Sequence, residues 1–191
     1  MNHLRQEQTL ILAKPDAVQR GLVGEIINRF ERAGFSLVGV KRVVPTATHV
    51  KKHYLPTREQ LEGMGGKTVA SLTSAGYDVV KFMGTDHPLK LGKIINQWNV
   101  DFLTSGPVVA MVFEGFDAVA KGRKIVGATM PSAAEIGTIR GDFSSEAPAL
   151  ANGEKRAVRN LVHASGSVGE AKREIGHWFL LKEVISATKK E

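Results

Sequence analysis

The segment VVAMVF at residues 108–113 is the most uniformly apolar run in the chain. A short apolar run of this kind, rich in β-branched residues, is typical of a strand that is buried on both faces. Turn residues Gly106 and Pro107 precede it, and Gly115 ends it. We therefore place a central strand here, around which the other elements have to pack.

Three further segments have the composition of shorter strands: residues 9–13, 35–44 and 160–162. Three segments have helical spacing: one from residue 22, one at 117–126 and one from 167. Gly34 is placed as the stop of the first helix, and Asp117 as the cap of the second. Ser167 and Glu170 fit a capping box that opens the third. The order predicts an α+β fold, a ferredoxin-like βαββαβ, with a four-stranded antiparallel sheet and helices on its faces.

Between the second and third strands the sequence predicts a helical hairpin, residues 70–101, broken near Pro88. The preceding GMGGKT at residues 63–68 ends like a phosphate-binding loop. It lacks the glycine that such a loop needs where Leu61 stands, and no buried strand precedes it, so we predict a turn.

A short helix capped by Thr46 and running to Tyr54 would place His49 and His53 one turn apart. That spacing suits a metal pair, but lysines intervene and no glutamate is adjacent.

The chain of 191 residues is long enough for one domain with insertions, and we predict a single domain over 1–191, with insertions at about 56–97 and 144–156. It has no cysteine, which excludes disulfides and thiolate sites. The start is polar and no run approaches the ~20 apolar residues that cross a bilayer, so we expect a cytoplasmic protein without membrane contact. A net charge of +7 favours anionic partners such as nucleotides or nucleic acid.

His163 is the residue on which a functional hypothesis can be built. It follows a short strand and precedes the helix that carries Glu174, one turn beyond Glu170. A carboxylate that accepts a proton from one ring nitrogen fixes the tautomer and leaves the other nitrogen able to attack. Lys14 stands at a strand tip, where it could bind phosphate or simply face solvent. A buried histidine without a catalytic role remains the alternative for His163.

Five segments together resemble the nucleoside diphosphate kinase family: AKPDAVQRGLVGEII, SGPVVAMVFEG, GRKIVGAT, PSAAEIGTIRGDF and NLVHASGSVGEAKREIGHWF. The resemblance covers most of residues 9–54 and 104–179 in the family's order. TIRGDF and NxxHxS are its most specific elements. The family's fold is the same ferredoxin-like arrangement.

The resemblance implies a role for each matching residue. His163 would be the phosphorylated histidine, Glu174 the carboxylate that orients it, and Ser165 a partner of Glu174. Lys14 would approach the transferred phosphate, and Asn160 would hold the sugar hydroxyl. The remaining nucleotide contacts would come from Tyr54, Arg123, Thr129 and Arg140.

The resemblance also implies the reaction and its partners. A nucleoside triphosphate such as ATP would give its terminal phosphoryl group to His163, and a nucleoside diphosphate would collect it, in a ping-pong sequence. Mg²⁺ would be held by the nucleotide phosphates, with no metal site made by the protein. A homo-oligomer is expected, a hexamer or another dimer-built assembly.

The sequence departs from the family pattern in places. Ala164 and Gly166 stand where glycine and aspartate are common, which removes a carboxylate beside the nucleophile. The aromatic residue that stacks on the base has no clear counterpart, and Trp98 or Phe102 are candidates.

Two other functions are considered. A family-like module that binds nucleotides without turnover is disfavoured because all motif residues are present. Nucleic-acid binding through the sheet is suggested by the charge, but the expected central segments VVAMVF and NLVHA carry a single phenylalanine between them, Phe113, so it would be secondary.

Overall fold

The computed structural model describes residues 6–186, which form two compact units. The first contains the described residues up to Val44, then Pro107–Ser145, and the chain from Asn160 onward. The second contains Pro45–Gly106 and Glu146–Arg159. It therefore includes the first predicted insertion and nearly all of the second. The prediction of a single domain with two insertions stays a prediction.

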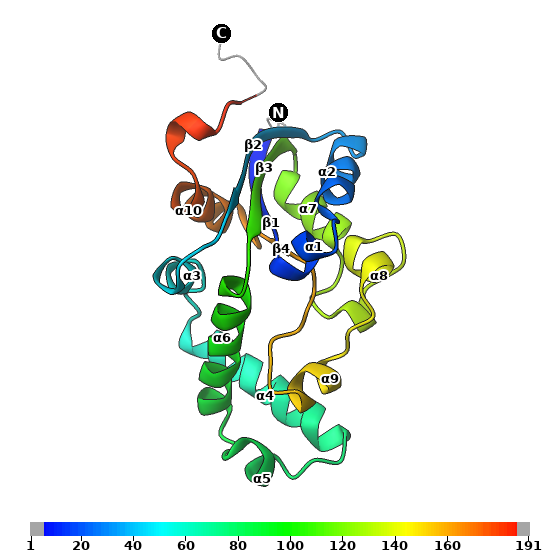
Figure 1. The fold of residues 1–191 in the computed structure, drawn as a ribbon, viewed down its shortest axis with the longest axis vertical. Helices are drawn as coiled ribbons and strands as arrows, with labels where there is room; N and C mark the ends of the chain where they lie inside the picture. Colours follow the sequence, from blue (N-terminus) through cyan, green and yellow to red (C-terminus); the bar gives the residue numbers. More distant parts are fainter. Residues whose placement is uncertain (1–5, 187–191) are drawn as a thin grey trace, which may run out of the picture. The chain divides into compact units, whose positions relative to one another are not determined.

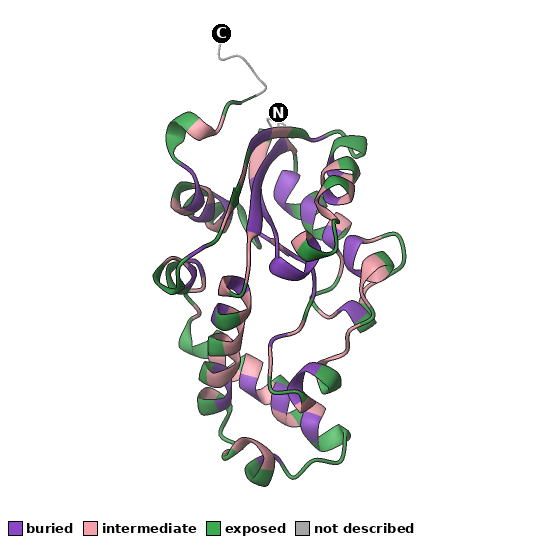
Figure 2. Ribbon diagram, viewed as in Figure 1, coloured by how far each residue is buried: buried purple, intermediate pink, exposed green. Residues whose placement is uncertain are grey.

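The first unit is built on a four-stranded sheet, as predicted. Its strands are β1 (Gln6–Ala13), β2 (Ser36–Val43), β3 (Val108–Phe116) and β4 (Val162–Ala164). They lie in the order β2-β3-β1-β4, and each neighbouring pair is antiparallel. Residues 108–113 of β3 are at most 6% exposed, which agrees with a strand covered on both faces (Figure 2).

Helices lie on both faces of this sheet (Figure 1). The helices of the first unit are α1 (Pro15–Gln19), α2 (Val23–Arg32), α7 (Ala118–Val126), α8 (Ile139–Phe143) and α10 (Val168–Trp178), with 3-10 turns at Pro131–Ala133 and Leu181–Glu183. On one face Phe30 of α2 stacks on Phe113 of β3, with ring centroids 4.4 Å apart. Side chains alternate between the two faces along a strand, so Ile11 and Met111 point to the same face as Phe113 and belong to the same core. Helix α10 contacts β1 on the opposite face.

The predicted capping signals are present, with two differences in their details. Gly34 ends α2 with a φ of 88°, a conformation that favours glycine. Asp117 lies at the N-cap of α7, but its side chain makes no capping bond, and Oε2 of Glu7 accepts from the Val119 N–H instead. The Ser167 hydroxyl accepts from the Glu170 N–H at 3.1 Å, while Glu170 reaches back to the N–H of Gly166.

The second unit is helical. It contains α3 (Ala47–His53), α4 (Arg58–Ser74), α5 (Val79–Met83), α6 (Pro88–Thr104) and α9 (Pro148–Gly153). Helices α4 and α6 pack together and confirm the predicted helical hairpin. The turn predicted at residues 63–68 is wrong, because these residues lie inside α4. Among the described residues, none of the helices has both the length and the apolar character needed to cross a membrane.

One glycine of that segment, Gly65, and one of α6, Gly92, allow the two helices to approach closely. A Cβ atom on Gly65 would lie 1.8 Å from the carbonyl oxygen of Pro88, and one on Gly92 would lie 1.9 Å from that of Leu61. Neither space can hold a methyl group. The two glycines therefore form the crossing point of α4 and α6.

Candidate active site

His163 lies in β4, opposite Leu12 of β1. Side chains alternate along a strand, so His163 and Ser165 point to the same face, the one on which α10 packs. The Nε2 atom of His163 is 2.9 Å from Oε1 of Glu174 in α10. The structure thus brings together a histidine and a carboxylate that the sequence separates by 11 positions.

Glu174 is held on both of its oxygens. Oε1 faces His163, and Oε2 accepts a 2.5 Å hydrogen bond from the Ser165 hydroxyl. Glu174 is 2% exposed and Ser165 is completely buried. Because a buried carboxylate needs such partners, its orientation is fixed before any substrate arrives. A neutral ring that donates from Nε2 to this carboxylate carries its lone pair on Nδ1.

The surroundings of His163 keep the ring neutral. Burial is the main cause that lowers the pKa of His163 below its ordinary value of 6.5, and the positive charges of Lys14, Arg140 and Arg123 lower it further. The negative charge of Glu170 acts in the opposite direction. The imidazole is therefore neutral at pH 7, with a proton on one nitrogen and a lone pair on the other, which is the form that can act as a nucleophile.

Lys14 and Asn160 are buried against each other. The Nζ atom of Lys14 donates to Oδ1 of Asn160 at 2.7 Å, and Nδ2 of Asn160 donates to the carbonyl oxygen of Thr129 at 2.8 Å. Burial lowers the pKa of Lys14 from 10.5 to about 8, and the charge of Arg140 adds to that effect. Asp16 raises this pKa again. At pH 7 the ammonium group remains charged.

Arg140 connects separate segments of the first unit. Its guanidinium donates to four backbone carbonyl oxygens: those of Gly127, Ala128, Asn160 and Val162, at 2.6–3.1 Å. The side chain is 6% exposed. This planar group therefore fixes the chain on both sides of Leu161 and the loop that follows α7.

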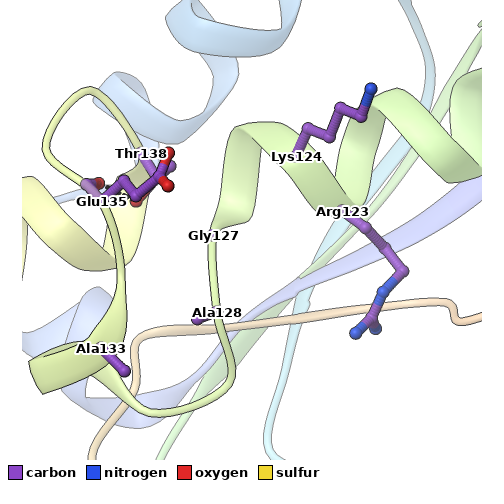
Figure 3. Close-up of a pocket in the computed structure, with 7 residues that line it drawn as sticks. All are labelled: Arg123, Lys124, Gly127, Ala128, Ala133, Glu135 and Thr138. Carbon is purple, nitrogen blue, oxygen red and sulfur yellow. Dashed lines mark hydrogen bonds between the residues drawn. The ribbon is translucent and has the colours of Figure 1, made fainter.

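Arg123 and Thr129 lie nearer the surface. Arg123 is on α7 and donates to the carbonyl oxygen of Ala164 at 3.5 Å. It also lines a pocket of about 570 Å³ next to Lys124, Gly127 and Thr138 (Figure 3). In this pocket Arg123 and Lys124 extend from α7 in different directions. The side chain of Thr129 is exposed, and the hydrogen bond described above uses its backbone carbonyl.

Tyr54, Trp98 and Phe102 belong to the second unit. Tyr54 follows α3, and its ring centroid is 4.8 Å from that of His53. Trp98 and Phe102 lie on α6 and line a pocket of about 260 Å³ together with Lys155, Arg156 and Arg159. The predicted contact of Tyr54 with Lys14 and the nucleotide stays a prediction.

Asp16 is a buried neighbour of this site that the sequence patterns do not indicate. It is 8% exposed, and its Oδ2 atom accepts from the N–H of Leu161 at 3.0 Å. The available signal was an acidic residue directly after the Lys14-Pro15 turn, but nothing local points to a partner 145 positions away.

Comparisons with known proteins identify the family of this chain. The family profile described as nucleoside diphosphate kinase matches residues 7–84 and 90–184. A nucleoside diphosphate kinase of Pyrobaculum aerophilum is 48% identical over 94% of this chain and 98% of its own length.

Two solved structures are similar as well. A crystal structure of an NDP kinase from Pyrobaculum aerophilum has a TM-score of 0.92 at 46% identity, covering 95% of this chain and 100% of that one. A transition-state mimic of nucleoside-diphosphate kinase from Borrelia burgdorferi, with vanadate and ADP bound, has a TM-score of 0.76 at 31% identity, covering 97% and 94%. This chain therefore belongs to the nucleoside diphosphate kinase family.

Proposed function

We propose that the nucleoside diphosphate kinase reaction of this enzyme proceeds through a phosphohistidine on His163. The observation that carries the proposal is the 2.9 Å contact between Nε2 of His163 and Glu174, whose other oxygen is held by Ser165. A neutral ring that donates its Nε2 proton to Glu174 carries its lone pair on Nδ1. A residue that carries a phosphoryl group covalently must be a nucleophile, and a neutral, oriented imidazole with a free lone pair meets that requirement.

The reaction then has two symmetrical halves. Nδ1 attacks the terminal phosphorus of a nucleoside triphosphate such as ATP, an N–P bond forms, and the P–O bond to the departing diphosphate breaks. A second nucleoside diphosphate attacks the phosphohistidine and takes the group. Because Nδ1 is unprotonated at the start, no proton has to leave the ring before attack. The Nε2 proton stays with the Glu174 contact, which stabilises the positive charge that develops on the ring.

The cationic side chains serve to stabilise charge on the phosphoryl oxygens. Lys14 and Arg140 are each at most 7% exposed and are anchored by Asn160 and by backbone carbonyls, so their charges are already in position when the nucleotide binds. Preorganised charge of this kind is the main means of catalysing phosphoryl transfer. Arg123, with a more exposed side chain, would contact the phosphates from α7.

The remaining roles concern the nucleotide. Asn160 would bind the sugar hydroxyl, Thr129 a phosphate, and Tyr54 would help to position Lys14 and the phosphates. Support for these roles comes from the motif positions, and for Asn160 also from its contact with Lys14.

Mg²⁺ is proposed as the cofactor, bound through the nucleotide phosphates. The residues of the first unit fit this mode: Glu174 already uses both oxygens on His163 and Ser165, and Lys14, Arg140 and Arg123 outnumber Glu170 among the charges that act on His163. Phosphate oxygens and water are ligands that Mg²⁺ prefers. When bound, the ion would neutralise charge on the phosphates, while Lys14 and the arginines of this chain orient the terminal group.

The assembly and the location are also proposals. The family resemblance supports a homo-oligomer, a hexamer or another dimer-built form, and light scattering of the purified protein would measure it. A cytoplasmic location is supported by the cysteine-free sequence.

Nucleic-acid binding is a weaker possibility for the sheet. Phe113 of β3 is completely buried in the core and cannot stack on a base, whereas Phe116, the last residue of the same strand, is 46% exposed. Any such binding would depend on the surface charge of the chain and would be secondary.

The proposal is tested with His163→Ala. The purified variant is incubated with ATP labelled in the terminal phosphate, and acid-labile label on the protein is measured together with exchange into several nucleoside diphosphates. We expect both signals to be lost in His163→Ala and kept in His87→Ala, because His87 is exposed and lies at the start of α6. Label or exchange that persisted in His163→Ala would refute the assignment of the nucleophile.

A further inference from the structure

We infer that Asp16 is a positioning residue for this reaction, because its buried carboxylate fixes the left-handed turn at Leu161 that joins Asn160 to the strand carrying His163. The inference rests on the proposed function of His163. Asp16 touches neither the imidazole nor, in the mechanism above, the nucleotide. It acts through the backbone and through Lys14.

The turn at Leu161 has an unusual backbone conformation. Leu161 has a φ of 68°, in the left-handed region that disfavours residues with a branched side chain. Its side chain is 1% exposed and belongs to the core of the first unit. A leucine stays in such a conformation when the surrounding contacts determine it.

Asp16 supplies one of those contacts from α1. Its Oδ2 accepts from the Leu161 N–H at 3.0 Å, and its Oδ1 accepts from the Ala17 N–H at 2.9 Å. Both oxygens of a nearly buried carboxylate are thus used on backbone groups. An N–H group at the turn would otherwise be buried without an acceptor, which native structures avoid.

The other polar groups of the turn are held by residues of the active site. The Leu161 carbonyl accepts from the Lys14 N–H at 2.8 Å, and the Asn160 carbonyl accepts from both the Val162 N–H and Nε of Arg140. Asp16 completes this set. The turn lies two residues before His163: it aims Asn160 at Lys14 and leads directly into β4, so a displaced turn would displace the reacting groups together.

Asp16 has a second effect on Lys14, through charge. In the first unit Lys14 faces two charged groups, Asp16 from α1 and Arg140 from α8, and one neutral titratable group, the His163 ring from β4. Burial and Arg140 lower the pKa of Lys14, whereas the carboxylate of Asp16 raises it. Neutralising Asp16 therefore lets Lys14 lose its proton at a lower pH.

The experiment compares the full-length wild type with Asp16→Asn and Asp16→Glu. The rate of His163 phosphorylation by ATP and kcat/KM are measured from about pH 6 to 10, with circular dichroism to establish folding. The kcat/KM of the wild type should fall as pH rises through about 8, where Lys14 of the free enzyme loses its proton. The pH at which kcat/KM falls reports the charge near Lys14. Substituting a residue with a purely structural role would leave that pH unchanged.

For Asp16→Asn we expect phosphorylation slowed by roughly tenfold or more and the alkaline limb moved to lower pH by about one unit. For Asp16→Glu we expect a similar loss of rate with the limb near that of wild type, because the charge remains while its longer side chain displaces the oxygen from Leu161. Asp78→Asn is the matched control: Asp78 accepts from the Lys81 N–H at the start of α5, and its loss should change neither quantity.

A wild-type rate or an unshifted limb in folded Asp16→Asn overturns the inference. If that variant does not fold, Asp16→Glu decides: a slowed rate with a retained limb supports the inference, and a wild-type rate overturns it. A wild-type enzyme that forms no phosphohistidine on His163 would instead refute the proposed function, so the two failures are distinguishable.

Discussion

At the scale of single residues, the hydroxyl group of Ser165 helps to fix the orientation of Glu174 and, through it, of His163. It donates to Oε2 of Glu174 at 2.5 Å, and its oxygen accepts from the Leu10 N–H at 3.3 Å. Replacing it with alanine leaves a buried carboxylate with one partner fewer and loosens the orientation of His163. We expect Ser165→Ala to lower kcat by about tenfold, equivalent to about 1.4 kcal/mol of barrier, while phosphohistidine still forms.

Steady-state exchange between ATP and a nucleoside diphosphate measures this effect. Ser186→Ala is the matched control, since Ser186 also donates to a buried glutamate, Glu114, at 2.8 Å on a different part of the sheet. An unchanged kcat in Ser165→Ala, or an equal loss in both variants, would contradict the role given to Ser165.

Some of these residues could be predicted from sequence and others could not. His163, Glu174 and Ser165 lie within 12 positions of one another, so a strand followed by a capped helix brings them together by local geometry. The hydrogen bond of Asp16 to Leu161 joins segments that are far apart, and it depends on a left-handed turn that leucine does not signal. The backbone partners of Arg140 depend on tertiary packing in the same way.

The crossing of α4 and α6 gives a prediction at the scale of the element. Gly65→Ala would place a methyl group 1.8 Å from the Pro88 carbonyl oxygen, so the two helices would have to separate. We expect the free energy of unfolding to fall by about 3 kcal/mol, at the upper end of the usual cost of overpacking. Urea denaturation followed by circular dichroism measures the change.

Gly63→Ala is the control for that substitution, because Gly63 lies on the same helix and a Cβ there meets no atom within 4 Å. It should raise the free energy of unfolding by about 0.5–1 kcal/mol, the usual gain when alanine replaces glycine inside a helix. Two variants with equal effects would show that α4 and α6 do not depend on close contact at Gly65.

The three longer strands and the helices α2, α7 and α10 follow from their patterns, whereas the short helices α1 and α8 and the long helix α4 do not. The strand predicted at residues 160–162 is displaced along the chain, because β4 begins only at Val162. Three of the four residues at positions 63–66 are glycines: Gly63, Gly65 and Gly66. Such a segment has poor intrinsic helix propensity and indicates a turn. Here tertiary packing outweighs that propensity, because glycine is the residue that fits the helix crossing. Local pattern alone carries no information about a partner helix more than 20 residues away.

At the scale of the whole molecule, the net charge of +7 should influence how nucleotides arrive. Long-range attraction between a basic protein and a polyanion speeds association and is screened by salt. We expect kcat/KM for a nucleoside triphosphate to fall several-fold between about 0.01 and about 0.5 M NaCl, with a much smaller change in kcat. Initial rates at fixed Mg²⁺ measure both, and a salt-independent kcat/KM would show that net charge plays no part in association.

The helical second unit draws its chain from two places, Pro45–Gly106 and Glu146–Arg159. Helix α9 packs on α4, and Nζ of Lys155 lies 4.5 Å from the ring centroid of Phe82, so the shorter segment is seated on the longer one. Neither segment is an independent loop that could be trimmed by itself. A shortened version of the protein would therefore have to omit both segments together, because removing either one would expose the surface that it covers on the other.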